Sequence, residues 1–259
     1  MDAPSEVDLL VERSEDLLSL TLNRPARANA LGPELVEALI SALVSAQDVR
    51  LCVLRGAGKH FCAGFDLSDL EDLSDGDLLW RVLRIERLLQ MVHHAPFPVL
   101  ALAQGQVVGA GADLFAASWR RVAAPNARFK MPGWNFELAL GTRRLTRLVG
   151  ADAARDLLID TKQLQAPEAL ACGLASDLAE REDWPEVIET SLQRARALPL
   201  SALQEMLALT TVDTRCEDIA AVVDTAARPG LKDRIIAYRD KVVAQRGKQD
   251  PKSPERPRG

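Results

Sequence analysis

Two glycine-rich turns, each placed where an apolar strand gives way to a helix, constrain the fold of this 259-residue chain most strongly. The first turn is HFCAGFDL, residues 60–67, which follows the apolar stretch RLCVLRGAG. The second is QGQVVGAGADL, residues 104–114, which follows PVLALAQG and leads into a helical pattern. Small residues at such positions let the backbone come close to another group. Because strands alternate with helices in this way, we predict an α/β fold.

The hydrophobic pattern along the chain predicts the other elements. Strands are expected over residues 7–13, 17–25, 50–58, 98–105, 119–125 and 127–131. Helices are expected over residues 32–47, 77–92 and 109–118, from Gly141 onward, and in long helices from 185 to 246. The composition of GKQDPKSPERPRG predicts a disordered tail. We therefore expect a core over 1–190, a C-terminal helical region over 191–246 and a disordered tail over 247–259.

Charge and composition restrict the partners. The formal net charge is −5, which argues against nucleic acid, although residues from Arg228 onward carry ten Lys/Arg and four Asp/Glu. The uncharged stretch 95–112 contains prolines, glutamines and glycines, which suit a buried strand and turn better than a membrane span. The acidic start does not resemble a signal peptide, and the four cysteines form no CxxC pair. We expect a cytoplasmic protein with buried free thiols, no metal and no membrane partner.

The two turns allow two interpretations. Small residues between a strand and a helix are most often packing devices. Alternatively, the two turns could point two backbone N–H groups at one oxygen, because amides at a helix start favour negative charge. Such an oxyanion hole stabilises a transition state by about 3–4 kcal/mol per donor. The sequence does not fit a dinucleotide-binding loop, because GQVVGAG lacks the GxGxxG spacing.

Several motifs, in order, resemble the crotonase (enoyl-CoA hydratase/isomerase) superfamily over roughly residues 7–245. LNRPARANAL resembles its N-terminal CoA-binding segment, and GAGKHFCAGFDL and GQVVGAGADL resemble its two oxyanion loops. GTRRLTRLVG resembles the segment after its catalytic loop, and APEALACGLAS resembles the stretch before its C-terminal helices. The resemblance implies a spiral of β-β-α units followed by a helical trimerisation region.

The resemblance also implies roles for individual residues. The backbone N–H groups of Phe65 and Ala110 would bind the thioester oxygen, and Phe65 would also shape the acyl pocket. The remaining expected substrate-binding residues are Arg24, Arg27, Ala28, Ala30, Ala63, Gly64, Asp66, Leu67, Gly109, Pro132, Gly133 and Trp134. Basic residues around Arg239 and Lys241 are expected near a CoA phosphate.

The acid–base residues depart from the family pattern, in which hydratases use two glutamates. Asp113 stands at the first of these positions, as in the dienoyl-CoA isomerases; alternatively it is a carboxylate that stabilises a helix start. Pro132-Gly133 stands where the family has Pro-Glu, and the loop that follows is about three residues short. Glu137 would replace the second carboxylate if this loop carried it inward, and otherwise it would lie in solvent.

Three functions stay open at this point. The first is an enoyl-CoA hydratase or isomerase of fatty acid metabolism, or a relative that hydrolyses or decarboxylates a thioester. The second is a non-catalytic acyl-CoA-binding homologue. The third is an interaction or nucleic-acid-binding protein, against which the acidic balance argues. Isomerisation needs one base and therefore fits the missing glutamate better than hydration does. We expect an acyl-CoA substrate, no separate cofactor because coenzyme A is part of that substrate, and a homotrimer or a hexamer built as a dimer of trimers.

Overall fold

The computed structural model describes residues 7–249 and confirms the α/β fold. Within these residues the larger sheet has the strand order β1-β2-β3-β4-β6-β9, and a smaller sheet has the order β5-β7-β8. β1 and β2 are antiparallel, whereas the later neighbours in the larger sheet are parallel. The strands are β1 Leu9–Ser14, β2 Leu17–Leu22, β3 Leu51–Gly56, β4 Val99–Ala103, β5 Gln106–Val108, β6 Arg120–Ala123, β7 Arg128–Lys130, β8 Leu164–Gln165 and β9 Asp177–Leu178.

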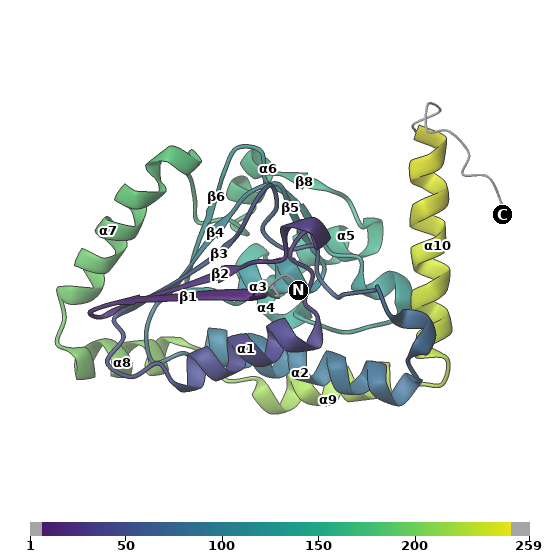
Figure 1. Ribbon diagram of the computed structural model, residues 1–259, viewed down its shortest axis with the longest axis horizontal. Coiled ribbons are helices and arrows are strands. Elements are labelled where there is room, and N and C mark those ends of the chain that lie inside the picture. Colours follow the sequence, from purple (N-terminus) through teal and green to yellow (C-terminus); the bar gives the residue numbers. More distant parts are fainter. Residues whose placement is uncertain (1–6, 250–259) are drawn as a thin grey trace, which may run out of the picture.

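Helices cover both faces of the larger sheet. Figure 1 shows α1, α2 and α9 on one side, α7 at one end of the molecule and α10 upright at the opposite end. The helices are α1 Pro33–Val44, α2 Asp75–His93, α3 Ala110–Ala117, α4 Thr142–Val149, α5 Ala151–Asp160, α6 Ala166–Ala171, α7 Trp184–Arg196, α8 Leu200–Thr210, α9 Arg215–Ala226 and α10 Leu231–Gln249.

Strand β3 shows how the core forms. Its residues alternate between the two faces of the sheet, as the period of two requires. Cys52 and Leu54 face the main core under α1 and α2, whereas Leu51 and Val53 face the smaller core that contains Trp184 of α7. Both faces are therefore buried, which is typical of a strand in a parallel sheet.

Local signals place the helix starts. Pro33 occupies the first turn of α1 after Gly32, and the apolar residues of that helix form its buried face. Ser74 and Asp77 form a reciprocal capping box at the start of α2. This cap explains why α2 begins at residue 75, two residues before the predicted start.

The predicted strands 119–125 and 127–131 are present as β6 and β7. They belong to different sheets, because β6 pairs with β4 whereas β7 pairs with β5.

The four cysteines are free, as expected. Cys52 and Cys62 are buried, but Cys172 is half-buried and Cys216 is exposed on α9, so the expected burial is wrong for these two thiols. Burial raises the pKa of Cys52 and of Cys62 to about 12.

The C-terminal helices extend across the expected boundaries. Helix α7 spans residues 190 and 191, where the sequence suggests the division between core and helical region. Helix α10 runs to Gln249, and the rest of the predicted tail, 250–259, lies outside the described residues. Within 7–249 no helix is long and apolar enough to cross a membrane.

Candidate active site

The two glycine-rich turns lie against each other. Val108 donates a backbone hydrogen bond of 3.0 Å to the carbonyl of Cys62, so the first turn is tied to β5. Gly64 has a φ of +89°, and a Cβ added to it would lie 2.5 Å from the Val108 carbonyl oxygen and 3.2 Å from the Ala110 nitrogen. A side chain at Gly64 would therefore push the turns apart.

Two backbone amides at this junction are available to a ligand. Among the hydrogen bonds of residues 7–249, none uses the N–H of Phe65 or the N–H of Ala110. Ala110 is the first residue of α3, after Gly109 with a φ of +53°, so its N–H is one of the unpaired donors of a helix start. Both residues line the same cavity.

This cavity has a volume of about 260 Å³ and a mainly apolar wall. Its lining includes Ala63, Leu67, Gly109, Pro132, Gly133 and Trp134, all of which the sequence analysis selected. The lining also includes residues that sequence reasoning does not identify, among them Leu138, Leu140, Leu158 and the α10 residues Ile235, Tyr238, Val242 and Val243. No local motif marks these residues, since they reach the cavity only through the tertiary fold.

Asp113 is the one carboxylate among the described residues that lines the cavity. It lies in the first turn of α3, and a Cβ added to Gly141 would overlap its carboxylate. Burial raises the pKa of Asp113 well above its usual value, while nearby Arg144 opposes the rise and Glu86 adds to it. A carboxylate with a raised pKa is, once ionised, a stronger base than an ordinary aspartate, which suits a group that takes up and returns a proton.

Glu137 lies outside the cavity. It ends the short turn Gly133–Phe136 in a left-handed conformation with a φ of +58°. Its side chain is 57% exposed and lies 3.6 Å from Arg228 in an ion pair. The shortened loop therefore does not carry Glu137 inward, and no second carboxylate lies beside Asp113 in the described cavity lining.

The expected CoA-binding residues near the N-terminus fall into two groups. Arg24 is used within the protein, because it donates to the Ala30 carbonyl and to Asp66, each at 2.7 Å. Burial raises the pKa of Asp66, but hydrogen bonds from Ser68 and Arg24 outweigh it, so the pKa is lowered overall. Arg27 is mostly exposed and lies 4.0 Å from Asp66, and neither arginine lines the cavity.

Ala28 and Asn29, in the same N-terminal segment, are hydrogen-bonded to the backbone of the first turn and of the residues just before it. Ala28 has a φ of +49° and accepts a hydrogen bond of 2.9 Å from the N–H of Ala63 in the first turn. Asn29 is fully buried, and its amide nitrogen donates to the carbonyls of Ala57 and His60. These contacts fix the approach to the first turn, and the sequence analysis did not single out Asn29.

Arg239 of α10 lines the cavity and is partly exposed. It pairs with Glu71 and with Asp240, the latter at 3.1 Å. Lys241, the other basic residue expected near a phosphate, is exposed. No group of three or more His, Cys, Asp or Glu within the described part of the chain could hold a metal ion.

Comparison with protein-family models decides the family. The model described as enoyl-CoA hydratase/isomerase matches residues 12–222. The chain belongs to this family. It is 33% identical over 253 residues to a "probable enoyl-CoA hydratase" of Mycobacterium tuberculosis, with 95% of this chain and 97% of that protein covered.

Two further members give the range of similarity. The 2,3-dehydroadipyl-CoA hydratase of Escherichia coli is 31% identical over 211 residues, which are 77% of this chain and 81% of that enzyme. A solved structure of a candidate enoyl-CoA hydratase/isomerase from Bordetella parapertussis has a TM-score of 0.89 and 43% identity, with 90% of this chain and 98% of that chain covered. These similarities confirm the crotonase fold of this enoyl-CoA hydratase/isomerase family member.

Proposed function

We propose that this protein is an acyl-CoA thioester enzyme that stabilises a thioester enolate and moves a proton with Asp113. The observation that carries the proposal is the position of Asp113 as the one carboxylate in the described lining of the cavity where the two turns meet. The available amides of Phe65 and Ala110 form the oxyanion hole in this proposal. Two such donors in a site without bulk water stabilise a developing oxyanion strongly.

The favoured reaction is isomerisation of a 3-enoyl-CoA to a 2-enoyl-CoA. The ionised Asp113 carboxylate takes a proton from C2, and the electron pair of that bond moves into a dienolate with negative charge on the thioester oxygen. Protonated Asp113 then returns the proton to C4, where it is bonded by the C3–C4 electron pair. The C1–C2 pair becomes the C2–C3 double bond, and the oxygen lone pair restores the thioester carbonyl. Atoms and electrons balance without water or a redox partner, so a single base is sufficient.

Hydration is the second candidate, and it is favoured by the names of the relatives in Mycobacterium tuberculosis and Escherichia coli. Hydration requires the enzyme to activate a water molecule and to protonate C2. The family's hydratases divide these tasks between two glutamates. Here Gly133 has no side chain and Glu137 is exposed, so Asp113 is the one carboxylate in the described lining of the cavity. Isomerisation therefore matches the geometry better.

In this proposal the apolar wall of the cavity binds the acyl chain, and basic residues bind coenzyme A. Arg239 lines the cavity, and we assign the CoA phosphates to its neighbourhood and to that of Lys241. The acyl-CoA itself supplies the reacting group, so the proposal includes no metal, flavin or nicotinamide. We also propose a homotrimer or hexamer, because exposed apolar residues such as Leu209 on α8 and Ile219 on α9 are available to a second copy of the chain.

A direct test incubates the protein with 3-hexenoyl-CoA or with 2-hexenoyl-CoA, separates the products by liquid chromatography and identifies them by mass spectrometry. We expect the first probe to give a product of unchanged mass that co-elutes with 2-hexenoyl-CoA, which marks isomerisation. Addition of one water to the second probe would instead favour hydration. Tight binding of both probes without any product would support the non-catalytic homologue.

The pH dependence of turnover follows from Asp113. The base works only when ionised, so kcat/KM should rise with pH as the Asp113 carboxyl loses its proton. Because burial raises the pKa of Asp113, the rise should lie above the pH range of an ordinary aspartate. A profile of kcat/KM against pH with 3-hexenoyl-CoA measures it. A flat profile across the acidic range would contradict the assignment of the base.

A further inference from the structure

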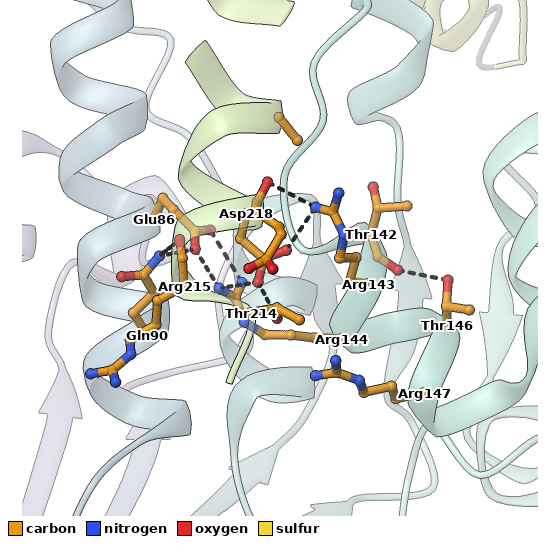
Figure 2. A network of polar contacts seen from close by, with 12 residues as sticks. Glu86, Gln90, Thr142, Arg143, Arg144, Thr146, Arg147, Thr214, Arg215 and Asp218 are labelled. Atoms are coloured by element: carbon orange, nitrogen blue, oxygen red, sulfur yellow. Dashed lines mark hydrogen bonds and ion pairs between the residues drawn. The ribbon is translucent and has the colours of Figure 1, made fainter. Parts of the chain in front are cut away.

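A buried charged cluster joins three helices next to the candidate active site. Arg144 of α4 donates through both Nη atoms to Glu86 of α2, and the Nη1–Oε2 distance is 3.2 Å. The same guanidinium lies 3.3 Å from Asp218 of α9. Arg144 is 3% exposed and Glu86 is 0% exposed. Figure 2 shows these residues converging, and we call them the Glu86–Arg144–Asp218 cluster.

Further hydrogen bonds hold the two carboxylates of this cluster. Gln90 donates to Glu86 at 2.9 Å, Thr214 donates to Asp218 at 2.9 Å, and Arg143 lies 3.1 Å from the other oxygen of Asp218. A buried ion pair often adds little stability compared with apolar residues of the same volume, because removing both charges from water is unfavourable. The stability of the fold alone therefore does not account for this cluster.

The cluster holds helix α4, whose N-terminal neighbour Gly141 lies against Asp113. Helix α4 begins at Thr142, directly after Gly141, and Gly141 contacts the Asp113 carboxylate. Arg144 lies one helical turn further along α4. A movement of α4 relative to α2 would therefore move Gly141 relative to Asp113, and the bonds from Arg144 to Glu86 oppose that movement.

The two charges of the Glu86–Arg144 ion pair also act on the pKa of Asp113 in opposite directions, because Arg144 lowers it and Glu86 raises it. The elements packed against α3 are α2, α4 and β5. Glu86 faces Asp113 from α2 and Arg144 faces it from α4, whereas β5 carries no titratable side chain. At the far end of α3, His93 of α2 contacts the Ala117 carbonyl, and across the cavity α10 contributes Tyr238 and Arg239.

We propose that Glu86 and Arg144 are positioning residues for Asp113, which hold helix α4 and its Gly141 against the carboxylate and balance the charge around it. The proposal rests on the proposed function, in which Asp113 is the base. The proposal goes beyond that function because Glu86 and Arg144 do not line the cavity, so they affect the reaction through Asp113.

The test uses a readout that does not require turnover. Infrared spectroscopy follows the carbonyl stretch of the protonated Asp113 carboxyl as the pH is varied, and the spectrum of Asp113→Asn identifies that band by difference. Four variants are compared with the parent protein: Glu86→Gln, Arg144→Gln, the double variant Glu86→Gln/Arg144→Gln and the control Arg143→Gln. Arg143 is a suitable control because it lies on α4 next to Arg144 and contacts Asp218 of α9. It is not among the charges that act on the pKa of Asp113.

The sign of each effect separates positioning from a general structural defect. Glu86→Gln leaves the positive charge of Arg144 less balanced, so the titration midpoint of Asp113 should move to lower pH. Arg144→Gln leaves the negative charge of Glu86, so the midpoint should move to higher pH. The double variant should titrate near the parent, and Arg143→Gln should leave the midpoint unchanged. If Arg144→Gln does not fold, Glu86→Gln and the double variant still decide the question.

Two outcomes would overturn the proposal. One is an unchanged midpoint in Glu86→Gln, and the other is a shift of both single variants in the same direction. Rates with 3-hexenoyl-CoA complete the experiment: at a pH below the midpoint of the parent, Arg144→Gln should lose about tenfold in kcat/KM for each unit of upward shift. If the midpoints move as expected but the parent turns over no enoyl-CoA, the proposed function fails while the control of Asp113 by the ion pair stands.

Discussion

Replacing Asp113 with Asn should lower kcat by about 10²–10⁴-fold, which is the usual contribution of general acid–base catalysis. The substitution keeps the size of the side chain but removes the proton acceptor. The affinity for hexanoyl-CoA, a saturated probe that cannot isomerise, should change little. This is because the amides of Phe65 and Ala110 are backbone groups that the substitution leaves in place. Steady-state kinetics with 3-hexenoyl-CoA and calorimetric titration with hexanoyl-CoA measure the two quantities.

Glu137→Gln is the matched control for this prediction. It removes one carboxylate by the same chemical change, but from a side chain that is 57% exposed and paired with Arg228. We expect kcat to stay within about twofold of the parent, since surface changes of this kind have small effects. Full activity in Asp113→Asn together with a loss in Glu137→Gln would show that the loop after Pro132 carries the base.

The second large effect is expected from Gly64→Ala. A Cβ at this position would lie 2.5 Å from the Val108 carbonyl oxygen, so the two turns must separate and the two amides lose their common target. Loss of one oxyanion donor reduces kcat by about 10²–10³-fold. Gly64 also has a φ of +89°, so alanine adds backbone strain of about 1–2 kcal/mol.

Gly150→Ala separates the strain from the loss of geometry. Gly150 has a similar φ of +83°, and a Cβ added there meets no atom within 4 Å. Both variants should therefore lower the melting temperature, Gly64→Ala by more because its Cβ also clashes with the Val108 carbonyl oxygen, but only Gly64→Ala should lose turnover. Equal losses of kcat in both would indicate that reduced folding, and not the position of the two amides, explains the effect.

Much of the fold was predictable because local signals and tertiary structure agree. Pro33 and the apolar spacing that follows it mark α1, and the two glycine-rich turns mark the strand-to-helix transitions that form the candidate site. Ordered family motifs then supplied the arrangement of the turns, which spacing alone does not determine. In the structure the two turns lie next to each other, since a Cβ added to Gly64 would be 3.2 Å from the Ala110 nitrogen.

The features that the sequence did not reveal depend on distant contacts or on one backbone angle. The left-handed conformation of Glu137 directs its side chain to Arg228, and neither feature has a sequence signal. The α10 wall of the cavity comes from residues far from the turns in the sequence, since Tyr238 lies 128 positions after Ala110 and 173 positions after Phe65. Glu86 does carry a signal, because it lies on the apolar face of α2 between Val82 and Leu89, its i−4 and i+3 neighbours, and a glutamate in such a position requires a partner.

Hydrogen exchange from solvent into the substrate tests the central claim, enolate formation by Asp113, most directly. The protein is incubated with 3-hexenoyl-CoA in D2O, and mass spectrometry follows deuterium entering C2 and C4. Asp113 can return the abstracted proton to C4 before that proton exchanges with solvent, so the same samples are separated by chromatography and analysed for unlabelled 2-hexenoyl-CoA. Deuterium uptake and conversion together measure enolate formation. We predict that the parent protein catalyses enolate formation and that Asp113→Asn catalyses it at least about 100-fold more slowly. Enolate formation in the parent no faster than in buffer, or equal enolate formation in Asp113→Asn, would contradict the account.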